Sequence, residues 1–181
     1  MSALGALSAT LADRELSIVP MEEAHREALR AICAEDAAIW AIYAVSYDPG
    51  HFDGSFDALT GNPRRQPVTF LVDGEIAGMT AWIDADHQRR VVEIGNTYLA
   101  PKWRGTGMNR RTKKLLLDHG FACGYRRIEL KVDSRNLRSQ AACAKIGAVR
   151  EGVIRADRIT WNGHVRDTVL FSILADEWRA R

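Results

Sequence analysis

Residues 93–109 read EIGNTYLAPKWRGTGMN and predict a strand, a glycine-rich turn and the start of a helix. β-Branched and aromatic residues give residues 91–99 the composition of a strand, and Pro101 ends it because proline lacks a ladder N–H. Gly105 and Gly107 let the backbone turn tightly. The helix that follows begins with N–H groups lacking a partner inside the helix, and its dipole adds partial positive charge. We interpret this stretch as a cradle for a pyrophosphate.

Two familiar phosphate-binding loops are excluded by their spacing. The chain contains no Gly-x-x-x-x-Gly-Lys-Ser/Thr string, which a P-loop requires. The dinucleotide-binding fingerprint requires a third glycine three residues after the second, and that position is Arg110. The alternative interpretation is an ordinary loop that holds two glycines, because two glycines alone are a weak signal.

Positive charge is concentrated around the glycine turn. The 181 residues carry a net charge of +2, which by itself indicates neither a nucleic-acid nor a membrane partner. Residues 102–138 hold eleven Lys or Arg and three acids, so this segment carries +8 and the remainder −6. Such a segment would attract a polyanionic ligand. Within it, Arg110, Arg111, Lys113 and Lys114 are expected to be merely solvated on a helix face.

The cysteines, histidines and apolar segments indicate which cellular compartment the protein occupies and whether it binds a metal. Cys33, Cys123 and Cys143 are odd in number and far apart, and the five histidines lack ligand spacing, so no disulfide framework or metal site is expected. No positive segment precedes the first apolar residues, and no apolar run reaches the ~20 residues of a membrane span. We expect a cytoplasmic protein with a loose leader over residues 1–13 and one domain over residues 14–181.

The hydrophobic pattern predicts an α+β fold with a mixed, mostly antiparallel sheet. In chain order we expect a strand (14–21), two helices (22–35 and 37–47), a short helix (55–59), three strands (67–72, 75–83 and 91–99), a helix (106–122), a strand (127–132), a helix (137–146) and two strands (149–158 and 165–174). Asn136 is a predicted N-cap. A helical crossover would make the strand at 127–132 parallel to the strand at 91–99. The polar segment 48–66 is a candidate lid.

Three features resemble the GNAT superfamily of acyl-CoA-dependent N-acyltransferases. Residues 102–107 (KWRGTG) are similar to its Gln/Arg-x-x-Gly-x-Gly/Ala loop, with lysine in the first place. Residues 136–148 (NLRSQAACAKIGA) are similar to its Asn-x-x-(Ala/Ser) helix, and the order of elements agrees over residues 14–178. The strings REG at 150–152 and RDTV at 166–169 resemble the branch of the ribosomal-protein N-terminal acetyltransferases RimJ and RimL. The resemblance implies a single GNAT-like domain, helices on both sheet faces and a splayed parallel strand pair at the cofactor site.

The same resemblance implies where acetyl-CoA binds. Backbone N–H groups from Trp103 to Asn109 would hold the pyrophosphate, and the backbone of Tyr98 to Ala100 would pair with the pantetheine as with an added strand. The helix after Asn136 would contact the sulfur end or the phosphates. The implied cofactor-binding residues are Tyr98, Leu99, Ala100, Trp103, Arg104, Gly105, Thr106, Gly107, Met108, Asn109, Asn136, Arg138, Ser139 and Lys145. No metal is implied.

Acyl transfer to an amine requires a neutral amine nucleophile and a stabilised oxyanion. Glu93 is the predicted base, because it lies on the strand implied to carry the cofactor. The alternative is a Glu93 side chain paired with Arg89 or Arg90 on an exposed face. A backbone N–H near Leu99 or Ala100 would stabilise the oxyanion.

The departing thiolate also requires a proton. Many members of the family use a tyrosine for this, at a place that Cys143 holds here, so the usual assignment fails. We predict Ser139 as the substitute, with plain cofactor binding as its alternative role. Tyr98 is a weaker candidate, because its strand position would bury it. A covalent Cys143 intermediate would require an activating base, and no such base is visible in the sequence nearby.

Together these roles predict direct transfer of an acetyl group from acetyl-CoA to a primary amine, on a peptide or protein N-terminus or on a small molecule. Trp40, Tyr43 and Trp82 are predicted to shape the acceptor pocket. The missing tyrosine keeps a second function open, a non-catalytic acyl-CoA-binding sensor or interaction module. Neither a nucleic-acid nor a membrane partner is expected, and a homodimer through the closing hairpin or its Trp161 is left open.

Overall fold

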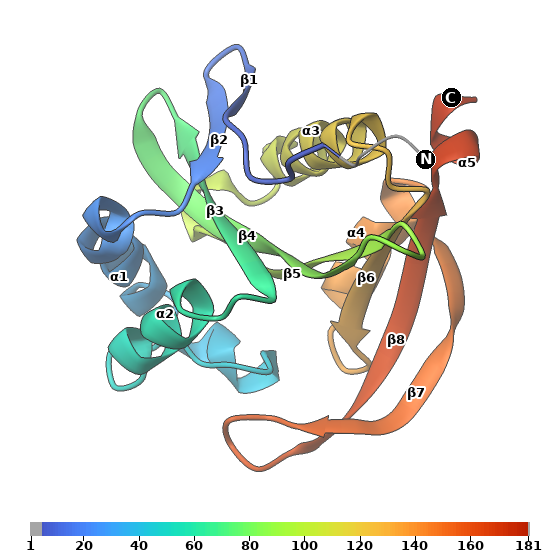
Figure 1. Cartoon of the computed structure of the whole chain (residues 1–181). Helices are drawn as coiled ribbons and strands as arrows, with labels where there is room; N and C mark the ends of the chain where they lie inside the picture. Colours follow the sequence, from blue (N-terminus) through green and yellow to red (C-terminus); the bar gives the residue numbers. More distant parts are fainter. Residues whose placement is uncertain (1–4, 181) are drawn as a thin grey trace.

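One eight-stranded sheet runs through the computed structural model, which describes residues 5–180 (Figure 1). The strands are β1 (Leu11–Asp13), β2 (Leu16–Pro20), β3 (Arg65–Val72), β4 (Glu75–Asp86), β5 (Val91–Leu99), β6 (Arg127–Asp133), β7 (Val149–Ile159) and β8 (Val165–Leu174). The α-helices are α1 (Arg26–Ala34), α2 (Phe52–Thr60), α3 (Met108–Ala122), α4 (Leu137–Lys145) and α5 (Ala175–Arg179), and the 3₁₀ helices are η1 (Glu23–His25), η2 (Ala37–Ile42) and η3 (Pro101–Trp103).

The strand order is β1-β2-β3-β4-β5-β6-β8-β7. Every neighbouring pair is antiparallel except β5 and β6, which are parallel because α3 crosses over between them. The prediction of a mixed, mostly antiparallel sheet with one parallel pair is therefore confirmed.

Helices cover both faces of the sheet, as predicted, and each face has its own core (Figure 1). On one face, Leu116 and Leu117 of α3 pack in a cluster with Ile128 of β6. On the other, Leu29 of α1 and Phe56 of α2 belong to a second cluster that includes strand residues. Since both faces of the central strands are buried, the position of β5 is set from two sides.

The expectation of a loose leader over residues 1–13 is wrong for residues 5–13. Leu11–Asp13 form β1, which pairs with β2. Leu7 is 3% exposed in the larger core, and the Gly5 N–H donates to the Cys123 carbonyl over 2.8 Å. Residues 5–13 have no helical or strand periodicity strong enough to predict this packing. Residues 1–4 lie outside the described residues.

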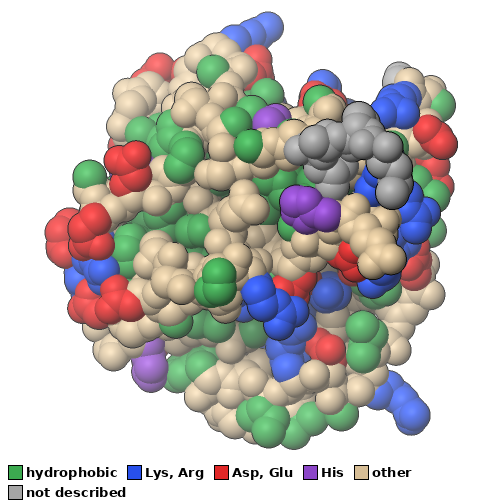
Figure 2. Space-filling view, in the orientation of Figure 1, with side chains coloured by type: hydrophobic (Ala, Val, Ile, Leu, Met, Phe, Trp, Pro, Cys, Tyr) green, Lys and Arg blue, Asp and Glu red, His purple; other side chains and the backbone are tan. Residues whose placement is uncertain are grey.

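The predicted helix at residues 37–47 is shorter than expected. Its helical part is η2, which ends at Ile42 because Tyr43 takes an extended backbone conformation. The candidate lid at residues 48–66 contains α2, whose Phe52 and Phe56 are 1% exposed. Arg30 of α1 pairs with Asp53 over 2.6 Å, and mixed acidic and basic side chains cover this edge of the molecule (Figure 2). An apolar core and surface ion pairs therefore both anchor α2.

The hairpin of β7 and β8 curves away from the sheet, and its tip returns to the segment after η2 (Figure 1). Trp161 donates from Nε1 to the Trp40 carbonyl over 2.9 Å and from its backbone N–H to the Ala44 carbonyl over 3.1 Å. The indole bond joins residues that are 121 positions apart in the chain. The described helices include none that is long and apolar enough to cross a membrane.

Candidate active site

A cavity of about 650 Å³ lies where β5 and β6 separate. Its wall is formed by the segment after η2, β5, the glycine turn, α3, β6, α4 and the β7–β8 hairpin. This volume is within the usual range for a site that takes a small molecule or cofactor. Eight lysine or arginine side chains but only two carboxylates contribute to the wall, which favours an anionic ligand.

The separation of β5 from β6 has a local cause in the backbone. The two strands pair only from Val91 with Arg127 to Glu93 with Glu129. Beyond that point β5 is distorted, since Asn96 has a φ of 54° and the register with β4 shifts. Beyond Glu93, the facing edges of β5 and β6 are therefore not hydrogen-bonded to one another. An unpaired strand edge can offer its backbone N–H and C=O groups to an extended ligand.

The glycine turn before α3 has the properties of an anion cradle. Gly105 and Gly107 have φ values of 78° and 87°, and a Cβ at either position would find no atom within 4 Å. The N–H groups of Gly105, Thr106, Gly107 and Asn109 find no acceptor within residues 5–180. The 15-residue helix α3 begins directly after them and adds partial positive charge. The turn thus fits a phosphate or pyrophosphate.

Three of the predicted backbone donors are already used, including the Met108 N–H, which donates to Thr106 Oγ1 over 3.4 Å. The Trp103 N–H donates to the Ala100 carbonyl and the Arg104 N–H to the Pro101 carbonyl, because these residues close the 3₁₀ turn η3. The Arg104 side chain is also engaged, with Nε donating to the Leu99 carbonyl over 2.7 Å and the guanidinium paired with Asp36. The prediction of Trp103 and Arg104 as backbone donors is therefore wrong.

The other predicted cofactor residues divide between cavity wall and core. The predicted cofactor residues that line the cavity are Leu99, Arg104, Gly105, Asn109, Asn136, Arg138, Ser139 and Lys145. Tyr98 is 1% exposed and donates from its hydroxyl to the Ile32 carbonyl, and Met108 is buried in the core. The Ala100 N–H donates to the Ala77 carbonyl over 2.8 Å, so it is not available to an oxyanion. Thr106 donates from its hydroxyl to the Trp103 carbonyl at the exposed turn.

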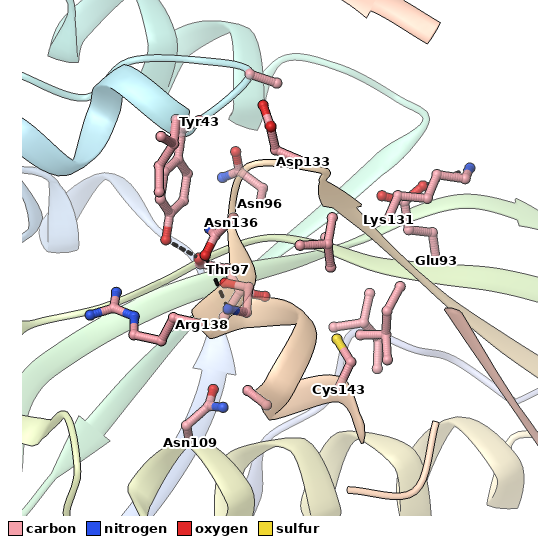
Figure 3. A pocket seen from close by; sticks show the side chains of 18 of the residues that line it. Tyr43, Glu93, Asn96, Thr97, Asn109, Lys131, Asp133, Asn136, Arg138 and Cys143 are labelled. Carbon is pink, nitrogen blue, oxygen red and sulfur yellow. Dashed lines mark hydrogen bonds and ion pairs between the residues drawn. The ribbon is translucent and has the colours of Figure 1, made fainter. Parts of the chain in front are cut away.

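Helix α4 carries the second predicted half of the cofactor site. The Asn136 carboxamide accepts the Ser139 N–H over 3.0 Å, so the predicted N-cap is confirmed. Asn136, Arg138 and Cys143 are seen at the cavity in Figure 3, together with Asn109 of α3. Arg138 and Lys145 are exposed at its edge and have no ion pair within residues 5–180. Both cations are thus available to an anionic ligand.

Glu93 lies in the cavity with an unexpected partner. Its carboxylate pairs with the Lys131 ammonium over 2.9 Å, and Figure 3 shows the two side chains pointing toward one another. Burial disfavours the charge of Lys131, but Glu93 outweighs it, so the pKa of Lys131 is raised. Pairing with Arg89 or Arg90 is therefore wrong, because the neighbouring strand β6 supplies a closer cation. The absence of a side chain at Gly95 makes room for the Glu93 carboxylate, because a Cβ at Gly95 would lie 2.5 Å from Glu93 Oε1.

Only one of the three predicted pocket aromatics reaches the cavity. Tyr43 lines it and donates from its hydroxyl to the Thr97 carbonyl over 3.0 Å, and burial raises the pKa of Tyr43 to about 12. Trp40 is fully buried and donates from its indole to the Cys33 carbonyl. Trp82 is 2% exposed in the core beneath α3. The prediction of Trp40 and Trp82 as pocket residues is thus wrong, since both pack inside the fold.

Two buried cations at the cavity were missed. Lys113 was expected to be solvated, but it is 7% exposed and donates to Thr97 Oγ1 over 2.8 Å. The helical spacing indicates its burial, because Lys113 precedes Leu116 and Leu117 by three and four residues and so shares their buried face of the helix. Arg166 of β8 is 6% exposed, and its Nε has no hydrogen-bond partner among the described residues 5–180. Burial lowers the pKa of both groups.

The described residues 5–180 contain no group of three His, Cys, Asp or Glu side chains placed to bind a metal. The three cysteines are free thiols and buried. Burial raises the pKa of Cys143, although the Lys113 ammonium opposes this shift. Cys143 is therefore a neutral wall residue and not an activated nucleophile.

Comparisons with known proteins agree with this architecture. The model of the acetyltransferase (GNAT) domain family matches residues 15–149. Rv2669 of Mycobacterium tuberculosis, an uncharacterized N-acetyltransferase, is 35% identical over 86 residues, which cover 48% of this chain and 54% of that protein. The chain thus spans about half the length of the curated relatives it matches.

Solved structures extend the likeness to nearly the whole chain. A GCN5-related N-acetyltransferase from Brucella melitensis is 25% identical with a TM-score of 0.86, covering 96% of this chain and 81% of that one. RimJ of Mycobacterium smegmatis, solved in complex with CoA-disulfide, is 23% identical with a TM-score of 0.76, covering 90% and 83%. At that identity the likeness to RimJ shows the fold alone.

Proposed function

This chain belongs to the GNAT family of acetyltransferases, and from that premise we propose that it transfers an acetyl group from acetyl-CoA to a primary amine by direct attack. The main support is the turn before α3, where Gly105 and Gly107 have left-handed backbone conformations. This turn leaves four N–H groups without an acceptor within residues 5–180 at the start of α3. This cradle opens onto the cavity between β5 and β6. A phosphate-bearing, extended donor is the ligand that these two features fit together.

Acetyl-CoA, when bound, supplies an activated thioester carbonyl. We assign its pyrophosphate to the N–H groups of the glycine turn, and its other anionic groups to the exposed Arg138 and Lys145. The free edge of β5 near Leu99 would pair with the pantetheine and present a backbone N–H to the developing oxyanion. Asn136 and Ser139 would contact the sulfur end.

The acceptor amine would enter the half of the cavity bounded by Tyr43, Glu93 and the β7–β8 hairpin. We propose a peptide or protein N-terminus, as in the RimJ and RimL branch, or a small-molecule amine. The buried free thiols fit a reducing compartment such as the cytoplasm. A homodimer remains a proposal from the sequence, with the Trp161 indole committed to Trp40 of its own chain.

The function is tested by thiol release. Purified protein with acetyl-CoA and a panel of peptide and small-molecule amines is expected to release coenzyme A with at least one acceptor. Coenzyme A binding is measured beside it by calorimetry. Binding without thiol release for any amine would contradict the proposed transferase and favour the non-catalytic acyl-CoA-binding module.

Replacing Glu93 with glutamine is expected to depress the rate mainly below the pKa of the acceptor amine, because a base matters most where the amine is protonated. The measurement is the pH–rate profile for the best acceptor. Glu129→Gln is the matched control, since Glu129 is the register partner of Glu93 on β6 but does not line the cavity. An unchanged profile in the Glu93 variant would remove Glu93 as the base.

Replacing Ser139 with alanine is expected to slow turnover, because it removes a hydroxyl from the cavity wall while the N-cap bond, made by the Ser139 backbone, is kept. The comparison is kcat and the KM for acetyl-CoA. A change confined to KM indicates a binding contact, and full activity would make Ser139 a bystander.

A further inference from the structure

Lys113 is a buried ammonium without a carboxylate partner at the proposed active site. It lines the cavity from α3 and is 7% exposed. An ammonium has three donors, and within residues 5–180 the one acceptor of Lys113 is Thr97 Oγ1, 2.8 Å away. A buried charge is costly unless it is paired. The side chain therefore has donor capacity left for a group that enters the cavity.

The surroundings of Lys113 do little to neutralise its charge. The titratable groups that face it are Cys143 from α4 and Glu93 from β5. Cys143 is a buried thiol, and the Glu93 carboxylate is already paired with Lys131. Burial consequently lowers the pKa of Lys113 to about 8. At neutral pH the group is mostly charged and can readily give up its proton.

Other proton-bearing groups of the cavity are less suited to donate a proton near neutral pH. The Tyr43 hydroxyl is bonded to the Thr97 carbonyl, and burial raises its pKa to about 12. The pKa of the Cys143 thiol is raised by burial. Lys131 is held by Glu93, which raises its pKa despite burial. Among these groups, Lys113 is the one whose pKa moves toward neutrality.

We propose that the Lys113 ammonium is the proton donor to the thiolate that leaves during acetyl transfer; this inference rests on the proposed function. The carbon–nitrogen bond to the acceptor forms as the carbon–sulfur bond breaks, and the sulfur takes a proton from Lys113 Nζ. The acceptor nitrogen loses a proton to the Glu93 carboxylate or to water, and Lys113 regains one from water. A thiol has a pKa of about 8.5, close to that of Lys113, so the transfer is nearly thermoneutral.

Lys113→Met is the direct test, with Lys114→Met as its matched control. Lys114 is the next residue of the same helix, but its side chain is 67% exposed and pairs with Asp118. We expect kcat to fall about 100-fold in the Lys113 variant, with little change in the KM for acetyl-CoA and none in the control. In the unchanged protein kcat should decline above about pH 8 as Lys113 loses its proton, and this limb should vanish in the variant.

A second measurement uses the unchanged protein and needs no turnover. Lysine labelled with ¹³C is titrated by NMR, and the signal that disappears in Lys113→Met is assigned to Lys113. We expect its midpoint near pH 8, against ~10.4 for exposed lysines. Ultraviolet absorbance then follows the thiol of bound coenzyme A, which should ionise at lower pH in the unchanged protein than in the variant. Equal thiol titrations, or an ordinary Lys113 midpoint, would overturn the proposal.

Two further results separate this inference from the proposed function. If no amine elicits thiol release, the transferase fails, while the thiol titration still decides the role of Lys113. If acetyl-CoA alone acetylates Lys113, as read by peptide mass spectrometry, Lys113 is an acyl acceptor and the proposal is overturned. Folding of the variant is checked by its Tm, which should not fall, since an apolar side chain replaces a buried charge.

Discussion

Coenzyme A binding is expected to weaken by about 100-fold when Gly107 is replaced by valine. Gly107 has a φ of 87°, where a β-branched residue is strained by about 1–2 kcal/mol or more. The backbone would relax toward negative φ and turn the N–H groups of Gly105 and Thr106 away from a common point. Each such bond to a phosphate contributes about 1.5–3 kcal/mol, so weakening two of them accounts for the roughly 2.8 kcal/mol that a 100-fold change in affinity represents. Calorimetric titration with coenzyme A measures the change.

Gly74→Val is the matched control. Gly74 has a φ of 80° in the β3–β4 turn, and a Cβ there would also find no atom within 4 Å. The two variants therefore carry a similar backbone strain, but Gly74 joins β3 to β4 and is not part of the glycine turn before α3. The control should lose stability and keep its affinity for coenzyme A. Equal losses of affinity in both variants would show that strain alone, and not the cradle, explains the effect.

The free energy of unfolding is expected to fall by about 3 kcal/mol when Gly78 is replaced by alanine. A Cβ on Gly78 would lie 2.2 Å from the Tyr98 carbonyl oxygen and 3.0 Å from the Leu99 Cα, both backbone atoms of β5. Neither can move without displacing the strand that forms the cavity edge. Denaturant titration measures the loss, and Tm should drop by about 6–12 °C for a chain of this size.

Gly54→Ala provides the contrasting control, because Gly54 lies within α2 and a Cβ there meets nothing within 4 Å. Alanine has the higher helix propensity, so this variant should gain up to about 1 kcal/mol. Gly78→Ala should also weaken coenzyme A binding, since β4 and β5 would separate near Leu99. A stable Gly78→Ala protein would mean that β4 can shift at no cost, contrary to the close approach described here.

Local patterns were sufficient for most of the sheet, for the glycine turn before α3 and for the cap of α4. The Asn136 cap and the strand before Pro101 each depend on a few neighbouring residues, and both occur as expected. The strand β1 was missed because Leu11–Asp13 are only three residues long. Their pairing with β2 gives them order that no local period reveals.

The half of the cavity proposed to take the acceptor amine was less predictable, because contacts between residues far apart in the sequence determine which side chains line it. Lys131 meets Glu93 only through the parallel register of β5 and β6, which the sequence does not specify to the residue. Lys113 lies in a basic run whose neighbours are exposed or paired, and only its place beside Leu116 and Leu117 sets it apart. An aromatic stripe such as that of Trp40 and Tyr43 is more often core than pocket wall, and Trp40 is core because its ring packs on Tyr98, with the ring centroids 4.8 Å apart.

The strand order has a consequence for how the chain is completed during synthesis. The last strand, β8, lies inside the sheet between β6 and β7, so β7 has no partner until β8 has been made. Because a domain generally folds as a unit, the cavity wall that Arg158, Ile159 and Arg166 contribute cannot close before β8 has been synthesised. A truncation after residue 164 would thus remove β8 and leave β7 and the facing edge of β6 without their partner strand.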